Sequence, residues 1–113
     1  MSAHTLIDNP AGHTQMEADA LDALRSVYDP EIPVNIYDLG LIYVLSITED
    51  KAIEVRMTLT APNCPAADII PNQVEGALAL VPEVTHVKVD LTFDPPFTPD
   101  MMSDEARLEL GLF

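Results

Sequence analysis

The spacing of apolar residues predicts a helix followed by a β-hairpin in the first half of the chain. From Gln15 to the residue before Pro30, apolar positions recur at helical spacing and acidic residues are enriched in the first turns. Residues 41–47 are apolar at nearly every position, which is typical of a central strand with both faces covered. After the polar turn 49–51, residues 53–59 alternate between apolar and polar side chains and predict a second strand.

The second half repeats a helix and a strand and then ends in a short helix. Residues 70–81 again show helical spacing, and Pro82 closes this second helix. Ser103 is a good N-cap for a last helix that ends at Gly111. Between these helices lies a third strand with four residues expected to point inward: Val87, Val89, Leu91 and Phe93.

This order of elements indicates the fold class. Helix, strand, strand, helix, strand and helix predict an α/β (α+β) two-layer fold, with a small mixed sheet and the helices on one face. A length of 113 residues fits one domain with one core. Residues 1–14 mix small, polar and helix-breaking residues, so we expect a flexible N-terminal tail before a single domain at 15–113.

Charge and cysteine content exclude several classes of function. Five basic and nineteen acidic residues give a net charge of −14, which repels nucleic acid and anionic membranes. The longest apolar run, residues 39–47, is about half the roughly 20 residues of a membrane-spanning helix. No signal-peptide pattern opens the chain, so we expect a cytoplasmic protein. The single cysteine, Cys64, excludes an intrachain disulfide and a zinc site built from several cysteines of one chain.

Cys64 is the strongest candidate for chemistry. Residues 58–65 predict a strand that hands over to a helix, and Pro65 favours an N-cap conformation at Cys64. A helix N-terminus favours the thiolate, the form that is nucleophilic and binds metals. Asp68 and the overall negative charge oppose this effect, so the sign of the net pKa shift stays open. The alternative is that Cys64 is a small buried apolar residue.

Polar residues near Cys64 complete the candidate set. Thr58 and Thr60 share a strand face and point toward whichever surface Cys64 lines. Oxygen ligands or a base can be drawn from three carboxylates, although such residues more often cap turns: Asp29, Glu31 and Asp38. The chain shows no Ser-His-Asp order, no phosphate-binding glycine loop and no zinc spacing. A conventional enzyme site is therefore not visible.

Three ordered motifs connect the chain to a known family: Asp29–Tyr43 (DPEIPVNIYDLGLIY), Met57–Pro65 (MTLTAPNCP) and Asp94–Phe97 (DPPF). With them, the chain resembles the SufT-type iron–sulfur cluster assembly factors of the broader MIP-like family. The resemblance implies a small α/β domain that matures iron–sulfur proteins, with Cys64 as the reactive residue. It also implies that five further residues gather around Cys64 in one pocket: Asp29, Glu31, Asp38, Thr58 and Thr60.

The first functional hypothesis is an assembly factor that helps deliver iron–sulfur clusters to apo-proteins and is not an enzyme. Cys64 would then bind iron or a cluster transiently, or contact a client protein, with no stably bound cofactor. One thiolate cannot hold a cluster that needs four cysteines, so we expect a homodimer or additional ligands. The partners implied are the iron–sulfur assembly machinery and its apo clients.

Two alternatives to the assembly factor stay open at this point. In one, the chain is a non-catalytic adaptor whose acidic surface docks a basic partner and whose Cys64 only packs. Its docking segment would contain Phe97, Met101 and Met102. In the second, Cys64 is the nucleophile of an enzyme that acts on an acyl or disulfide substrate, although no histidine is placed to act as its base.

Overall fold

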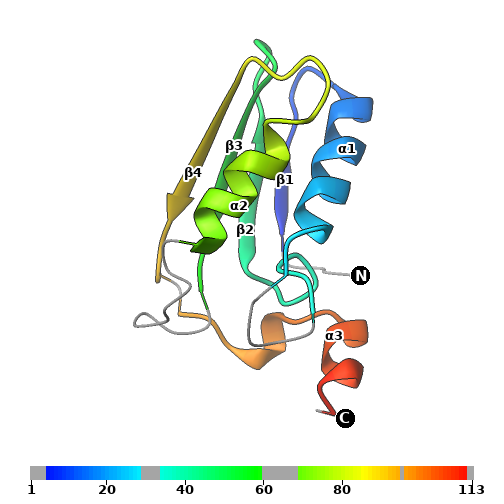
Figure 1. The fold of residues 1–113 in the computed structure, drawn as a ribbon, viewed down its shortest axis with the longest axis vertical. Helices are drawn as coiled ribbons and strands as arrows, with labels where there is room; N and C mark the ends of the chain where they lie inside the picture. Colours follow the sequence, from blue (N-terminus) through cyan, green and yellow to red (C-terminus); the bar gives the residue numbers. More distant parts are fainter. Residues whose placement is uncertain (1–4, 29–33, 60–68, 95, 112–113) are drawn as a thin grey trace.

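The computed structural model describes residues 5–28, 34–59, 69–94 and 96–111 of the chain. Its elements follow the chain in the order β1 (Leu6–Asp8), α1 (Thr14–Arg25), β2 (Ile42–Ile47), β3 (Ala52–Met57), α2 (Ile69–Leu78), β4 (His86–Leu91), a 3₁₀ helix (Pro99–Met101) and α3 (Asp104–Glu109) (Figure 1).

The four strands form one mixed sheet in the order β1-β2-β3-β4. β2 and β3 form an antiparallel hairpin at the centre, as predicted, while β1 and β4 pair in parallel with their neighbours. Each parallel pair is connected through a helix, as parallel pairing requires. α1 and α2 lie on one face of the sheet, and α3 lies beyond its end (Figure 1). The predicted α+β fold with a small mixed sheet is confirmed.

β1 is a strand that the apolar spacing did not predict. Its three residues are all exposed, so they carry no alternation that a pattern search can detect. β1 is held by pairing with β2, and the Thr5 hydroxyl donates a hydrogen bond of 2.7 Å to the Ile42 carbonyl. Asn9 then accepts a hydrogen bond from the His13 backbone N–H at the start of α1. The segment expected to be a flexible tail therefore supplies a fourth strand.

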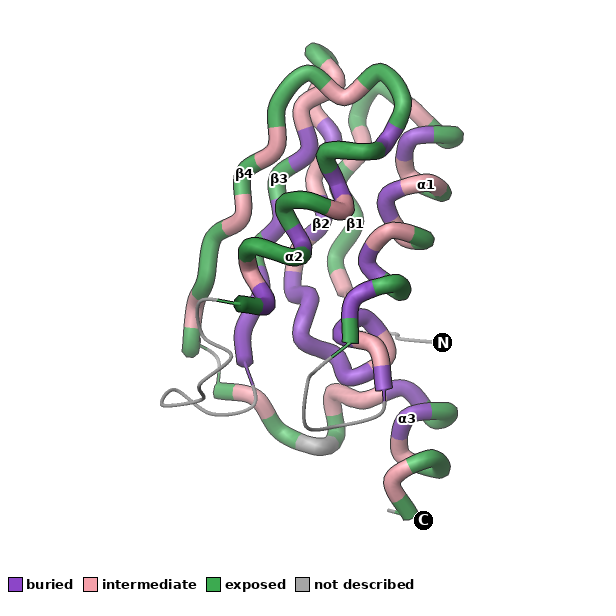
Figure 2. The backbone as a smooth tube through the Cα atoms, in the orientation of Figure 1, coloured by how far each residue is buried: buried purple, intermediate pink, exposed green. Residues whose placement is uncertain are grey.

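The core lies between the sheet and its two covering helices. The alternation predicted for the hairpin is observed, because Ile53, Val55 and Met57 are buried while Glu54 and Arg56 are exposed. Figure 2 shows the buried positions concentrated along β2, β3 and the inner faces of α1 and α2. The helices contribute six buried residues: Met16, Ala20 and Leu24 from α1, and Ile70, Val74 and Leu78 from α2.

The third strand predicted from the sequence corresponds to β4. Its predicted burial is wrong at two positions. β4 lies at an edge of the sheet, where less of its surface is covered. Val87 and Val89 are half-buried, but Leu91 and Phe93 are 39% and 41% exposed. The alternation of apolar residues identified the strand and which of its faces points toward the core. The degree of burial depends instead on how much of that face the neighbouring helix covers.

The last helix begins as predicted. The Ser103 side chain accepts a hydrogen bond of 3.1 Å from the Ala106 backbone N–H, which caps α3. Ala106 is buried against the core, and Gly111 follows the helix with a positive φ of 71°. So short a helix is marginal by itself, so its docking at the end of the sheet is what stabilises it.

Candidate functional site

The predicted site residues divide into those that the structure describes and those that lie outside the described residues. Cys64, Thr60, Asp29 and Glu31 belong to the second group. Their gathering in one pocket therefore stays a prediction. The described parts of the three motifs can be placed on the sheet.

All three motifs reach the same end of the sheet. Ile42, where β2 begins, pairs with Met57, where β3 ends, and Met57 also pairs with Leu91, where β4 ends. The Thr58 backbone N–H continues this arrangement by donating to the Leu41 carbonyl at 2.9 Å. The described ends of the motif segments therefore lie together with α3 at what we call the motif end of the sheet (Figure 1).

Asp38 is held in a tight turn by Asn35. The Asn35 side chain accepts a hydrogen bond from the Asp38 backbone N–H and donates another to the Asp38 carboxylate, both at 2.8 Å. This reciprocal pairing fixes the chain before β2. Asp38 thus has the turn role expected of such acids, while Asn35, which the sequence analysis did not select, is its partner. An Asn three residues before an Asp, ahead of a glycine, is the signal that could have found it.

The turn at Asp38 is joined to the C-terminal segment by backbone contacts. The Ser103 backbone N–H donates to the Asp38 carbonyl at 2.8 Å, directly before α3. Gly40 lies against the backbone of Met101, so close that no Cβ would fit there. Of the predicted docking residues, Phe97 and Met102 are half-buried and pack on the core. Met101, also half-buried, accepts a hydrogen bond at its Sδ from the Tyr43 hydroxyl at 3.5 Å.

Thr58 is fully buried beside Tyr43 at the motif end. Its hydroxyl hydrogen-bonds the Tyr43 phenol, and it also lies 3.5 Å from the Leu59 carbonyl. Burial raises the pKa of Tyr43 above its ordinary value of 10.0, and the hydrogen bond with Thr58 offsets part of this rise. Thr58 therefore has a partner inside the protein, and its proposed part in a pocket around Cys64 stays a prediction.

The raised pKa of Tyr43 predicts a loss of stability at alkaline pH. The fold favours the neutral phenol, so this contribution is present below pH 10.0 and is lost as the pH rises through the higher pKa of the folded state. We expect the free energy of unfolding of the wild type to fall more steeply between about pH 9 and 12 than that of Tyr43→Phe. Urea titrations across this range measure the difference, and parallel curves would contradict the prediction.

A small hollow adjoins Asp38. It has a volume of about 180 Å³ and lies between the turn at residues 34–38 and α3. Glu105 and Glu109, one helical turn apart on α3, add two carboxylates that the sequence analysis did not select. Within the ranges that the structure describes, no group of three or more His, Cys, Asp or Glu side chains is arranged to hold a metal ion. With Asp38, Glu105 and Glu109 in its lining, the hollow is an acidic recess.

Comparison with known proteins identifies the class to which this fold and these motifs belong. The sequence model of the iron–sulfur cluster assembly protein family matches residues 17–107. The chain belongs to this family. The resemblance found from the three motifs is thereby confirmed.

Individual relatives agree with this assignment. The chain is 58% identical over 97 residues to a protein of Porphyromonas gingivalis named Fe-S protein maturation auxiliary factor, covering 86% of this chain and 92% of that protein. It is 40% identical over 86 residues to the Fe-S protein maturation auxiliary factor SufT of Staphylococcus aureus, covering 76% and 98%. A crystal structure of a domain of unknown function from Bacillus anthracis superposes with a TM-score of 0.84 at 33% identity, covering 93% and 100%. In the described part of the present chain, no helix is long and apolar enough to cross a membrane.

Proposed function

We propose that this chain is a cytoplasmic maturation factor that helps deliver iron–sulfur clusters to apo-proteins, with Cys64 as its reactive residue. The observation that carries the proposal is the family match over residues 17–107, which includes all three motifs and Cys64. The cluster, or its iron, is the cargo of this activity. The chain acts by binding and transfer and not as an enzyme.

The burial of residues near both ends of the segment that carries Cys64 supports this role. Leu59, the last described residue before the segment, is 2% exposed, and Ile70, the second described residue after it, is fully buried. Leu59 and Ile70 thus both belong to the core cluster, although Ile69 between the segment and Ile70 is 50% exposed. A reactive residue is most effective when rigid elements support the segment that presents it.

Cluster transfer through one cysteine per chain requires further ligands. Four-iron and two-iron clusters are commonly held by four cysteine thiolates, and this sequence contains one. We therefore propose a homodimer in which Cys64 of each copy contributes to the same cargo, completed by carboxylates or by a small-molecule thiol. The partners are the assembly machinery that donates the cluster and the apo-proteins that accept it.

Anaerobic reconstitution with iron and sulfide tests the proposal directly. Wild type, Cys64→Ala and Cys64→Ser are treated in parallel, and iron, sulfide, absorption and molecular mass are measured across a sizing column. We expect a cluster that elutes with the wild-type dimer and is absent from both variants. In cells, Cys64→Ala should lower the activity of an iron–sulfur enzyme to the level found without the chain.

Two outcomes separate cargo binding from other roles. Loss of maturation in cells without any cluster binding in vitro would assign Cys64 to a client contact. Full maturation by Cys64→Ala would remove the cysteine from the mechanism and favour the adaptor that docks through Phe97, Met101 and Met102. Circular dichroism of both variants excludes misfolding as the reason for any loss.

A further inference from the structure

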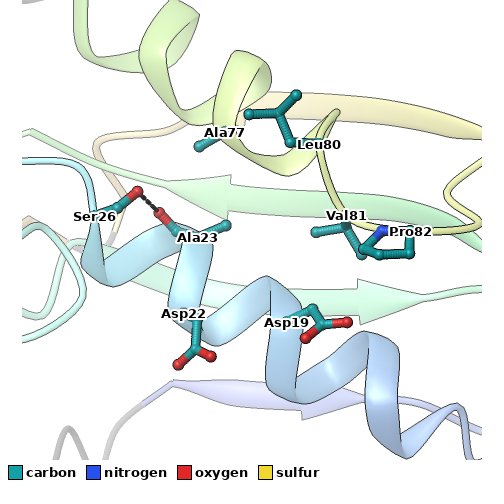
Figure 3. A pocket seen from close by; sticks show the side chains of 8 residues that line it. All are labelled: Asp19, Asp22, Ala23, Ser26, Ala77, Leu80, Val81 and Pro82. Carbon is teal, nitrogen blue, oxygen red and sulfur yellow. Dashed lines mark hydrogen bonds between the residues drawn. The ribbon is translucent and has the colours of Figure 1, made fainter.

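A groove runs between the two helices that cover the sheet. Asp19, Asp22 and Ala23 of α1 line it together with Ser26, the C-cap residue of this helix. Ala77 of α2 and Leu80 line the other side of a hollow of about 330 Å³. Figure 3 shows the side chains of Ala23, Ala77 and Val81 between the two helices, with the two aspartates along α1. We call this surface the α1–α2 groove.

The groove continues toward the motif end. A second hollow, of about 470 Å³, shares Ser26, Ala77 and Leu80 with the first and extends to Tyr28. Tyr28 forms a β-bridge with Asn35, the residue that holds the turn at Asp38. Asp19 to Ser26 alone spans about 10 Å at 1.5 Å per residue, so the two hollows together accommodate roughly two turns of a helix.

The apolar surface of the groove is open. Leu80 is 83% exposed and Tyr28 is 54% exposed, and both border the groove. Small residues on the facing helices, Ala23 and Ala77, leave the hollow that these larger side chains border. A single exposed leucine is ordinary on a protein surface, but two large apolar side chains along one continuous hollow indicate a surface that binds another apolar group.

The charge around the groove indicates which charge a binding partner carries. Asp19 and Asp22 lie on the α1 side, and all five basic residues of the chain are described and none of them lines either hollow. The nearest in sequence, Arg25, is stacked over the Tyr37 ring at 4.8 Å. Two other basic residues face acids of their own, Lys51 with Glu83 and Lys88 with Asp90. The α1–α2 groove is thus apolar at its base and negative along one side.

We propose that the α1–α2 groove docks a basic amphipathic helix of a partner protein, with apolar side chains in the hollow and lysine or arginine opposite Asp19 and Asp22. Helix-in-groove recognition uses this combination of an apolar base and a charged rim. The groove ends beside Tyr28 and Asn35, so a docked partner reaches the motif end. The proposal rests on the shape and charge of the groove and is independent of the role of Cys64.

Binding of a defined helical peptide tests the proposal. The probe is a fluorescent peptide of about 14 residues with leucines on one face and lysines on the other, and the control peptide carries glutamates in place of lysines. The full chain is titrated into each peptide and anisotropy is recorded at low and high salt. We expect binding of the basic peptide only, weakening as salt is added.

Matched variants locate the binding. Leu80→Ala should weaken binding about tenfold, whereas Leu108→Ala, the same change at a 69% exposed position of α3, should leave it unchanged. Asp19→Asn with Asp22→Asn should weaken it about fivefold. The control pair, Asp50→Asn with Asp100→Asn, removes two negative charges at positions outside the groove. It should change the affinity for the peptide less than twofold.

Several results would overturn the proposal. Equal weakening by the two aspartate pairs would mean that the peptide responds only to net charge. Equal affinity of Leu80→Ala and Leu108→Ala would mean that the hollow is not the binding surface. Sedimentation of wild type and Leu80→Asp provides a third test, because a dimer lost in this variant would show that a second copy of the chain covers the groove.

Discussion

Gly40→Ala should destabilise the protein by about 4 kcal/mol, a large fraction of the stability of a small domain, because two separate penalties add at this position. Gly40 has a φ of 83°, where a residue with a Cβ costs about 1–2 kcal/mol. A Cβ would also overlap the carbonyl oxygen of Met101 and lie 2.6 Å from the carbonyl carbon. The obstacle is backbone on both sides, so no rotamer change relieves it.

Two other glycines separate these penalties. Gly111 has a similar φ of 71° but nothing within 4 Å of its missing Cβ, so Gly111→Ala should cost only about 1–2 kcal/mol. Gly76 lies inside α2 with open space around it, and Gly76→Ala should stabilise the protein by about 0.5–1 kcal/mol. Urea unfolding of the three variants measures their free energies of unfolding and so tests this order. A Gly40→Ala cost no larger than that of Gly111→Ala would show that the Met101 contact is not tight.

The contact between Gly40 and Met101 joins the turn before β2 to the C-terminal segment. Gly40 and Asp38 belong to the first motif, and both touch the segment at residues 101–103, which follows the third motif. Asp38 accepts the Ser103 backbone N–H, and Gly40 allows the Met101 backbone to approach. A change at Gly40 therefore affects the C-terminal segment and α3 as well as the turn before β2. We expect loss of α3 docking to accompany the loss of stability.

Local patterns predicted most of the secondary structure. The alternation at residues 53–57 fixed the buried face of β3, and the serine at 103 with its following acids located the start of α3. These features depend on neighbours within one turn or one strand, which a sequence displays directly. β1 escaped prediction because three exposed residues form no pattern and its pairing partner lies 38 residues away.

The contacts that organise the motif end could be predicted only in part. The motif residues themselves identified the family, and the turn role of Asp38 follows from its residue type. The approach of Gly40 to Met101 and the pairing of Thr58 with Tyr43 join residues distant in sequence, and no local preference encodes them. Leu91 and Phe93 were expected inside, but the edge position of β4 leaves them exposed. Such features depend on tertiary packing, which overrides strand propensity.

Leu59→Ala should lower the free energy of unfolding by about 3 kcal/mol and the melting temperature by roughly 10 °C. Leu59 is 2% exposed, belongs to the main core cluster and is the last described residue before the segment that carries Cys64. Removing its branched end leaves a cavity that the surrounding sheet and helices cannot fill without strain. Because stabilities of small domains are about 5–15 kcal/mol, this is a large fraction of the total.

Leu108→Ala is the matched control for this prediction, since it deletes the same atoms at a 69% exposed position. It should change the free energy of unfolding by less than about 0.5 kcal/mol. Thermal and urea unfolding of both variants give the comparison, and equal effects would place Leu59 outside the cooperative core. If Leu59→Ala shows the expected loss, Leu59 unfolds together with the sheet. The chain at Leu59 would then be as stable as the core to which this residue belongs.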